Sequence, residues 1–295
     1  MTTGVSSDQM ARLDRLRAAL ASFHRVVVAF SGGADSAFLA KVATEVLGAE
    51  RVLCATAVSP SLAPEELADC AALAAEWGLQ WRTVASAELE DPAYTVNDAE
   101  RCRYCKSALM DALDALIGMP GAPSGEPATQ VVVGVNVDDL GDHRPGQRAA
   151  ADRGARFPLV EASLTKADVR ALSRELGLRT WDKPAAACLA SRLPYGTPVT
   201  VSTLASVAAA ESALRSLGYQ GLRVRHYGDL ARIELDPDDL VDAVVRRDHV
   251  VELVQAAGYR YVTLDLEGYR SGNLNAAAGI ASSDPGAHRG EGGGR

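Results

Sequence analysis

Three cysteines stand in surroundings that suit sulfur or metal chemistry. Cys102 and Cys105 form a Cys-x-x-Cys pair in the segment ERCRYCK, and the basic residues around them favour the thiolate form. Cys188 lies in PAAACLASRLPYG, where small residues let a substrate come close and where Ser191 and Arg192 follow soon after. One pair is only half of a tetrahedral zinc site, and the sequence has no second pair. Metal binding or nucleophilic chemistry is expected for the pair, and two incidental helix cysteines are the alternative.

A second candidate site is the segment SGGADS, residues 31–36. Its two glycines let the backbone approach an anion, and its hydroxyl groups add hydrogen-bond donors. The segment lacks the Gly-Lys-Ser/Thr ending of the mononucleotide P-loop and does not fit Gly-x-Gly-x-x-Gly. A tight strand-to-helix turn is the alternative to a phosphate site. The residues expected to bind the phosphates are Ser31, Gly32, Gly33, Asp35 and Ser36.

Acidic residues follow a later apolar run, in NVDDLGDHRPG. Ligands of open α/β sheets bind at the carboxyl ends of strands, so these residues are expected to face the same crevice as residues 31–36. Asp138, Asp139 and Asp142 are candidate magnesium ligands, and Arg144 is a candidate partner for a phosphate. A solvated acidic loop is the alternative.

Arginines recur in the last third of the chain. Arg223 and Arg225 alternate along a predicted strand and therefore share one face. Together with Arg232 and with Arg270 in GYRSG they are expected to form an anion pocket, and exposed salt bridges are the alternative.

The elements that must position these residues alternate between strands and helices over residues 1–180. The run RVVVAF before the glycines is short, apolar and rich in β-branched residues, as in a strand of a parallel sheet that is buried on both faces. Helical spacing of apolar residues follows it. The pattern predicts an α/β domain with a parallel sheet. Its strands are expected at 26–30, 51–59, 81–85 and 130–137, and helices at 9–23, 35–47, 63–78 and 165–176 and after the cysteine pair.

The pattern changes after the segment that holds Cys188. A helix over 201–217, strands over 222–226, 229–235 and 261–266, and a helix around 240–245 predict a smaller α+β domain at 195–276. Residues 277–295 are expected to form a disordered tail.

Composition limits the classes of function. At 295 residues the chain suits two domains, and with 47% apolar and 23% charged residues it can bury a core. Its net charge of -8 argues against general binding to nucleic acid or to an anionic membrane. No run approaches the roughly 20 apolar residues of a spanning helix, and no secretory signal stands at the start. A cytoplasmic setting is expected, in which Cys54 and Cys70 pack in the core.

The segment SGGADS resembles the pyrophosphate loop, or PP-loop, of the ATP pyrophosphatases, a group that contains GMP synthetase, NAD synthetase and tRNA-thiolating enzymes. The resemblance implies an adenine nucleotide alpha hydrolase-like domain whose loop grips the β- and γ-phosphates of ATP. A nucleophile then attacks the α-phosphorus and pyrophosphate leaves. Asp35 would be a partner for Mg²⁺ or a hydrogen-bonding residue of the loop.

Five segments, in order, are similar to motifs of the LarE-type ATP-dependent sulfur transferases, which act in making the nickel-pincer nucleotide cofactor. The similarity as a whole extends from about residue 9 to residue 276, and the five segments are SGGADS, ERCRYCK, NVDDLGDHRPG, PAAACLASRLPYG and LDLEGYRSG. The resemblance implies a cytoplasmic homo-oligomer that adenylates a carboxylate of a pyridinium dicarboxylate mononucleotide and converts it into a thiocarboxylate. The residues that it assigns to this substrate are Arg144, Ser191, Arg192, Arg223, Arg225 and Arg270.

The resemblance leaves two sources of sulfur. In some members the cysteine in the segment of Cys188 gives up its own sulfur and becomes dehydroalanine. In others three cysteines hold a 4Fe-4S cluster whose fourth iron takes an extra sulfide, and Cys102, Cys105 and Cys188 favour this version here.

Two other classes of protein stay open. Another PP-loop enzyme, such as a tRNA thiolase or an amide synthetase, is disfavoured by the acidic balance, by the absence of an added RNA-binding domain and by the absence of a glutaminase domain. A non-catalytic nucleotide-binding or iron-sulfur scaffold would release no pyrophosphate with any candidate acid.

Overall fold

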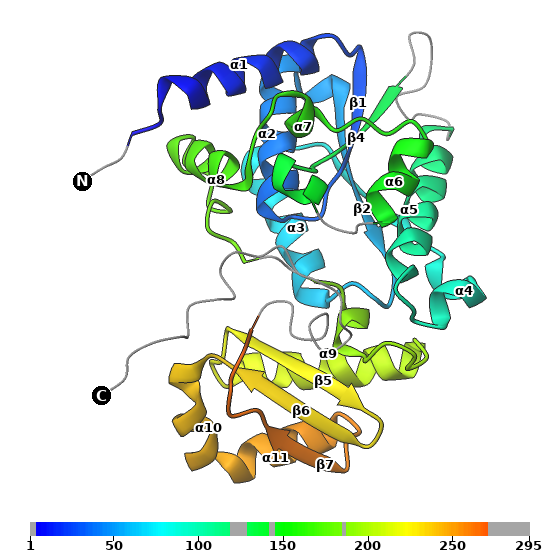
Figure 1. The fold of residues 1–295 in the computed structure, drawn as a ribbon, viewed down its shortest axis with the longest axis vertical. Coiled ribbons are helices and arrows are strands. Elements are labelled where there is room, and N and C mark those ends of the chain that lie inside the picture. The colour runs from blue at the N-terminus through cyan, green and yellow to red at the C-terminus, as the bar shows by residue number, and fades with distance from the viewer. Residues whose placement is uncertain (1–3, 119–128, 142–144, 185–186, 271–295) are drawn as a thin grey trace. The chain divides into compact units, whose positions relative to one another are not determined.

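The computed structural model describes residues 4–118, 129–141, 145–184 and 187–270. The chain forms two compact units, the first from Met1–Tyr94 and Glu100–Ala187 and the second from Thr95–Ala99 and Cys188–Arg295 (Figure 1). The short segment Thr95–Ala99 therefore belongs with the second unit. Three predictions lie outside the described residues, namely the roles of Asp142 and Arg144 and the tail at 277–295.

A four-stranded parallel sheet forms the centre of the first unit, as the apolar runs predict. The strand order is β3-β2-β1-β4, so that the two strands followed by candidate site residues, β1 and β4, are neighbours. The predicted α/β class is thereby confirmed. The strands are β1 (Arg25–Ala29), β2 (Val52–Val58), β3 (Trp81–Ala85) and β4 (Thr129–Val133).

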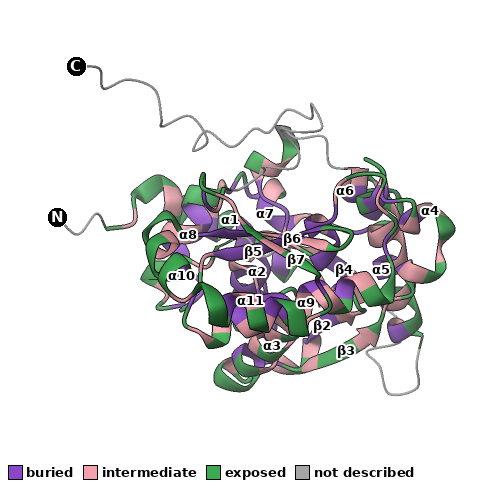
Figure 2. Cartoon of the chain, turned by 90° about the horizontal axis from the view of Figure 1, so that it is seen from below, coloured by how far each residue is buried: buried purple, intermediate pink, exposed green. Residues whose placement is uncertain are grey.

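Helices cover both faces of this sheet because successive residues of a strand point to opposite sides. Val26 and Val28 of β1 pack with residues of α1, α2, α3 and α8, whereas Val27 between them packs with residues of α5 and α6. Most residues of β1 and β2 are buried, the class that Figure 2 colours purple. The helices are α1 (Ser7–Ala21), α2 (Ala34–Leu47), α3 (Pro64–Trp77), α4 (Pro92–Thr95), α5 (Arg101–Ile117), α6 (Pro145–Asp152), α7 (Pro158–Glu161) and α8 (Lys166–Glu175).

The second unit has a three-stranded sheet with one apolar face. Strands β5 (Leu222–Tyr227) and β6 (Leu230–Leu235) are antiparallel, and β7 (Tyr261–Leu264) runs parallel to β6. Leu222 and Val224 of β5 pack in a core with residues of the helices α9 (Val201–Ser216), α10 (Leu240–Val245) and α11 (Arg247–Ala256). The alternate residues of β5 and β6, which include the arginines, lie on the opposite face.

Several elements differ from the sequence prediction, among them the short helices α4 and α7, which were not predicted. Strand β4 ends at Val133 rather than at residue 137, because the Val135 N–H bonds back to the Val133 carbonyl and the chain turns away from the sheet. Helix α6 was not predicted. The predicted helix around 240–245 ends at Val245, and a separate helix, α11, follows it.

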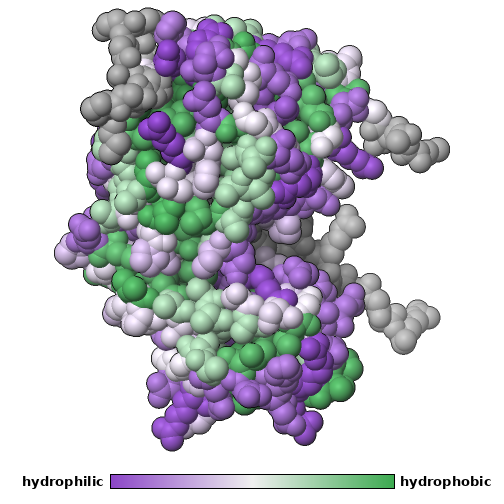
Figure 3. Space-filling view, turned by 180° about the vertical axis from the view of Figure 1, so that it is seen from behind, coloured by the Kyte–Doolittle hydropathy of each residue, from purple (hydrophilic) through white to green (hydrophobic). Residues whose placement is uncertain are grey.

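The surface in Figure 3 mixes hydrophilic and hydrophobic side chains. Among the described residues, no helix is both long enough and apolar enough to cross a membrane.

Candidate active site

The loop of residues 31–36 connects β1 to α2, as the sequence predicts. Gly32 has φ +68°, a conformation that suits glycine. The Ser36 side chain holds the loop closed, since its Oγ accepts the Ser31 N–H at 3.2 Å and donates to the Gly33 carbonyl at 3.2 Å. The N–H groups of Gly32 and Gly33 make no hydrogen bond within the described residues. With the start of α2 they form a concave set of donors suited to an anion.

Asp35 meets residues from the end of β4 beside this loop. Asn136, which is 1% exposed, donates from Nδ2 to Asp35 Oδ1 at 3.1 Å, and its own N–H donates to Asp139 Oδ2 at 3.2 Å. Burial raises the pKa of Asp35 above its ordinary value, the Asn136 hydrogen bond opposes this, and the charge of Asp139 adds to it. A cation beside Asp35 and Asp139 would relieve this cost, so the two carboxylates suit Mg²⁺ bound together with phosphate.

Asp138 has a different role from Asp139. Its Oδ2 accepts the backbone N–H of Lys166 at 2.7 Å, at the first residue of α8. The carboxylate therefore binds a helix N-terminus, where negative charge is favourable. The same helix is capped by Thr165, whose side chain accepts the Asp168 N–H.

Gly134 brings the end of β4 against the start of α2. A Cβ at this position would lie 2.8 Å from the Ser36 N and 3.0 Å from the Asp35 carbonyl carbon. Only glycine allows this approach without a backbone shift. This close approach allows the loop of residues 31–36 and Asn136 to lie next to each other.

Cys102 and Cys105 lie in the first turns of α5. Residues three apart share one side of a helix, so the two thiols point to the same side. Cys102 is exposed and Cys105 is partly buried. Gly146 of α6 packs against this turn, since a Cβ there would lie 2.7 Å from the Cys102 carbonyl oxygen.

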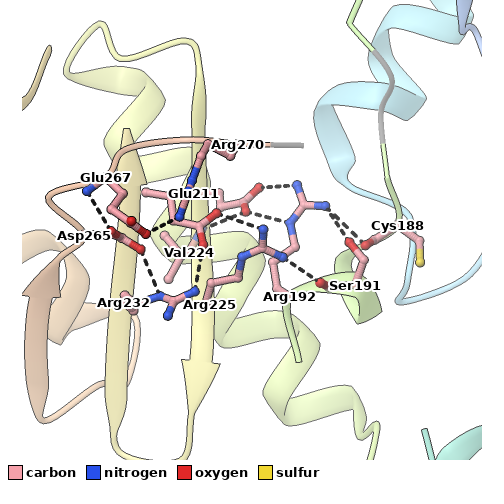
Figure 4. A network of polar contacts seen from close by, with 11 residues as sticks. Cys188, Ser191, Arg192, Glu211, Val224, Arg225, Arg232, Asp265, Glu267 and Arg270 are labelled. Atoms are coloured by element: carbon pink, nitrogen blue, oxygen red, sulfur yellow. Dashed lines mark hydrogen bonds and ion pairs between the residues drawn. The ribbon is translucent and has the colours of Figure 1, made fainter. Parts of the chain in front are cut away.

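Cys188 belongs to the second unit, where it precedes the short helix η4 (Leu189–Arg192). Its carbonyl oxygen accepts the Ser191 N–H at 2.9 Å and Arg192 Nη1 at 3.2 Å. The thiol is exposed and points away from the arginine network behind it (Figure 4). The backbone at Cys188 is therefore fixed while its sulfur is accessible.

Arg192 forms a buried ion pair with Glu211 of α9. Its Nε and Nη2 donate to the two carboxylate oxygens at 2.8 and 3.0 Å, and Glu211 is 0% exposed. Burial alone would raise the pKa of Glu211, but the hydrogen bond and charge of Arg192 outweigh burial and lower it. Glu211 also accepts the Val224 N–H of β5 at 3.1 Å. This carboxylate thus joins the segment of Cys188 to the sheet.

Arg225 is paired within the second unit. It donates to Glu234 at 2.8 Å and to the Ser191 carbonyl at 2.9 Å. The Ser191 bond places η4 on the polar face of the sheet. Arg270 is half exposed and pairs with Glu267. The predicted exposed salt bridge therefore applies to Arg270, whereas the Arg225 pair is buried.

Arg223 is the arginine of this face that makes no hydrogen bond or ion pair within the described residues. It is 7% exposed, and its guanidinium carbon lies 4.9 Å from the centre of the Tyr269 ring. Burial lowers the pKa of Arg223, and the positive charges of Arg192 and Arg225 lower it further. A buried cation beside two others is a favourable place for an anion.

The three candidate cysteines are divided between the two units. Cys102 and Cys105 belong to the first unit and Cys188 to the second, and none of the five cysteines forms a disulfide. Cys54 and Cys70 are buried in the core of the first unit, as predicted. Within the described residues there is no group of three or more His, Cys, Asp or Glu side chains that could hold a metal ion.

Comparison with known proteins adds the family. The NAD synthase family model matches residues 12–104, which contain the glycine loop. An uncharacterized Synechocystis protein, slr1717, is 47% identical over 266 residues, 90% of this chain and 97% of the relative. The pyridinium-3,5-bisthiocarboxylic acid mononucleotide synthase of Lactiplantibacillus plantarum, LarE, is 41% identical over 260 residues, 88% of this chain and 92% of the relative. The chain belongs to the LarE family.

Membership of the LarE family identifies the chain as an ATP-using sulfur transferase of pincer cofactor biosynthesis, with a PP-loop domain. The similarity extends to a more distant, uncharacterized protein of Methanocaldococcus jannaschii, MJ0830, at 26% identity over 247 residues. The family predicted from the five sequence motifs is thereby confirmed.

Three residues of this LarE-family chain were missed by the sequence prediction as contributors to the site. Two of them are Gly134, at the end of β4, and Glu211, the partner of Arg192. The third is Lys183, whose Nζ donates to the Gly32 carbonyl at 3.2 Å. The only local signal for Gly134 is an isolated glycine at a predicted strand end, and no local signal pairs Lys183 with a loop 151 positions earlier.

Proposed function

We propose that this chain uses ATP to activate a carboxylate of a pyridinium dicarboxylate mononucleotide and converts it into a thiocarboxylate. The observation that carries the proposal is the loop of residues 31–36, whose Asp35 lies beside Asn136 and Asp139 at one edge of a parallel sheet. The name of the Lactiplantibacillus plantarum relative supports this acceptor.

The adenylation step uses the groups of the first unit. Ser31, Gly32, Gly33 and Ser36 hold the β- and γ-phosphates, and Asp35 and Asp139 hold Mg²⁺. A carboxylate oxygen of the substrate attacks the α-phosphorus, the bond to the bridging oxygen of the β-phosphate breaks, and pyrophosphate leaves. A sulfur nucleophile then attacks the carbonyl carbon of the acyl-adenylate, and AMP leaves. Adenylation is needed because a carboxylate itself repels nucleophiles.

The phosphate of the mononucleotide binds in the second unit. Arg223 is its principal partner in this proposal, because the guanidinium is buried, positively charged and without an acidic partner among the described residues. Arg270 is accessible on the same unit and contributes to the site. Arg192, Arg225 and Ser191 shape the site through their mutual bonds. Arg144 stays a candidate outside the described residues.

In the first candidate, Cys102, Cys105 and Cys188 would hold a 4Fe-4S cluster as the source of sulfur. The donor set fits in kind, since each of the three thiols is exposed or partly exposed and none is in a disulfide. Three thiolates are sufficient to hold such a cluster, which would supply the sulfide when bound. Sacrifice of Cys188 is the second candidate: its Sγ attacks the acyl carbon and AMP leaves. Loss of the Cα proton then breaks the Cβ–S bond, so that the sulfur stays on the thiocarboxylate and dehydroalanine remains. The exposed, backbone-anchored thiol of Cys188 favours this second candidate.

Anaerobic purification with iron and sulfide analysis separates the two sources of sulfur. We expect about four iron and four sulfide per chain, lost in Cys102→Ala, Cys105→Ala and Cys188→Ala. Cys54→Ala is the matched control, because Cys54 is a core cysteine and should leave the iron content unchanged. A colourless protein whose Cys188 loses the mass of hydrogen sulfide during turnover would establish sacrifice instead.

A pyrophosphate-release assay with a panel of candidate acids tests the acceptor. Release with the pyridinium mononucleotide alone supports the proposal, whereas release with tRNA or with a simple amide precursor would assign the chain to another PP-loop reaction. No release with any acid would indicate a nucleotide-binding scaffold.

We also infer a cytoplasmic homo-oligomer from the resemblance to the LarE-type enzymes. Sedimentation of the purified protein tests the oligomeric state, and the mass of a single chain at all concentrations would contradict the homo-oligomer.

A further inference from the structure

Lys183 connects the end of the first unit to the glycine loop. Its Nζ donates to the Gly32 carbonyl at 3.2 Å, to Glu66 Oε2 at 2.8 Å and to Asp69 Oδ2 at 2.6 Å. The lysine side chain is 17% exposed. Both carboxylates lie on α3, and a Cβ at Gly32 would approach Cys70 Sγ of the same helix to 2.9 Å. One side of the loop is therefore packed against α3 and bonded to Lys183.

The three bonds use the full donor capacity of the ammonium group, which has three N–H donors. The pKa of Lys183 is raised, since its hydrogen bonds to the two carboxylates and their negative charges outweigh burial, which would lower it. The group is therefore charged and saturated by protein acceptors. In this arrangement it acts on the loop rather than as a phosphate ligand.

The bond to Gly32 fixes the direction of one peptide group. In a planar trans peptide the C=O and the following N–H point in opposite directions. A Gly32 carbonyl that points to Lys183 and α3 therefore directs the Gly33 N–H to the opposite side. That N–H makes no hydrogen bond within the described residues, and it lies next to the start of α2. Glycine at position 32 makes rotation of this peptide easy, so an external partner is needed to hold it.

We propose that Lys183 is a positioning residue that orients the Gly32–Gly33 peptide so that its N–H binds the terminal phosphates of ATP. The inference rests on the proposed assignment of residues 31–36 to ATP. It adds a residue from a distant segment to the nucleotide site and predicts that this residue acts on the phosphate chain and not on the nucleoside.

Arg179 provides a matched control for the charge cluster. It donates to the same Asp69 at 2.6 Å and to Glu76 at 2.9 Å, but no hydrogen bond joins it to the loop. Arg179→Met therefore removes a cation from the α3 carboxylates and leaves the Gly32 bond in place. Lys183→Met removes both the charge and that bond while it keeps most of the apolar stem.

The experiment measures the dissociation constants of ATP and AMP by calorimetry for the full chain and its variants, with thermal unfolding as a check on folding. We expect Lys183→Met to weaken ATP binding roughly 10- to 100-fold, the effect of one charge-assisted hydrogen bond, and AMP binding less than about twofold. Lys183→Arg should recover part of the loss because it keeps a charged donor. Arg179→Met should leave both constants within about twofold of the original.

Two outcomes overturn the inference: unchanged ATP affinity in Lys183→Met, or an equal loss of ATP and AMP affinity, which would indicate general damage.

Gly33→Val distinguishes a wrong role for Lys183 from a wrong assignment of the loop to ATP. Gly33 tolerates a Cβ inside the protein, where the nearest atom would be Ser31 Oγ at 3.5 Å, but a branched side chain obstructs the anion. If Gly33→Val keeps its ATP affinity, the loop itself is not the nucleotide site. If only Gly33→Val loses affinity, the loop assignment stands and the role of Lys183 is wrong.

Discussion

At the scale of single residues, the arginines near Cys188 differ in what they bind. Arg192 and Arg225 each face a glutamate that is 0% exposed, and both also bond to backbone carbonyls around η4. Arg223 has a tyrosine ring beside it instead of a carboxylate. A buried ion pair that also bonds to the backbone joins two segments of the structure, whereas a buried arginine without an acidic partner is suited to an incoming anion.

Arg223→Ala should weaken binding of the mononucleotide substrate roughly 10- to 100-fold and leave ATP binding intact, because it removes a charge-assisted contact to the substrate phosphate alone. Separate titrations with the substrate and with ATP measure the two effects. Arg260→Ala is the matched control, since Arg260 is an exposed arginine of the same unit whose guanidinium carbon lies 5.3 Å from the Tyr261 ring centre. An equal loss of affinity for the substrate and for ATP in Arg223→Ala would show that the assignment of Arg223 to the substrate phosphate is wrong.

Glu211→Gln should lower the free energy of unfolding by about 3 kcal/mol, because it leaves the buried Arg192 without its countercharge. The pH dependence gives a second readout. The pKa of Glu211 lies below its ordinary value in the folded chain, so its stabilisation is present above the unfolded pKa of about 4.5 and is lost as pH falls through the lower folded pKa.

Denaturant unfolding between pH 7 and pH 3 measures both effects of Glu211→Gln. The original chain should lose stability across the acid range more steeply than the variant, since the variant has no carboxylate at position 211 to protonate. Parallel pH profiles for the two proteins would contradict the assignment of this carboxylate as an ionised member of the network.

At the scale of elements, the proposed nucleotide site depends on two neighbouring strands that end side by side. The loop after β1 and the turn after β4 meet through Gly134, where the backbone of one strand end lies against the start of α2. The Asn136 bond to Asp35 then fixes the acidic residues beside the loop. A change at this contact should therefore weaken the binding of ATP more than the binding of the mononucleotide.

Gly134→Ala should raise the dissociation constant of ATP at least about tenfold and lower stability by roughly 1–3 kcal/mol, since a Cβ placed 2.8 Å from the Ser36 N forces the two elements apart. Calorimetry with ATP and thermal unfolding measure the two quantities. Gly118→Ala is the control in the same unit, because a Cβ there has no contact closer than 3.6 Å. Unchanged ATP affinity in Gly134→Ala would show that the approach of β4 to α2 is not needed for binding.

Local patterns predicted the elements that carry the site but not the contacts that join them. The apolar run before Gly32 and the helical spacing after it were sufficient for the strand, loop and helix, and the cysteine pair was placed at a helix start. The pairs Arg192–Glu211 and Lys183–Gly32 join distant segments through tertiary packing, which no local period records. The end of β4 was missed because the apolar residues continue to Val137 although the backbone leaves the sheet at Val133.

At the scale of the whole molecule, each unit has its own hydrophobic core. The first unit has one cluster on each face of its sheet, and the second has a cluster on one face of its three strands. All three tryptophans, Trp77, Trp81 and Trp181, belong to the first unit. Tryptophan fluorescence therefore reports on the nucleotide unit, and far-ultraviolet circular dichroism reports on both units.

Glu211→Gln should separate the unfolding transition seen by circular dichroism from the one seen by tryptophan fluorescence. The variant weakens the second unit, so we expect part of the circular dichroism to be lost at lower denaturant while the tryptophan transition keeps its midpoint. Gly134→Ala, a change in the first unit, should shift the tryptophan transition. Identical shifts of both signals in Glu211→Gln would contradict independent cores.

The central claim is that ATP activates a carboxylate of the substrate, and the fate of the carboxylate oxygen tests it most directly. The purified protein is given ATP and the pyridinium mononucleotide labelled with ¹⁸O in its carboxylates, and the nucleotide products are analysed by mass spectrometry. We predict pyrophosphate that forms only when the mononucleotide is present, together with AMP that carries one ¹⁸O atom from the carboxylate. Formation of ADP and phosphate, or AMP without the label, would contradict the account.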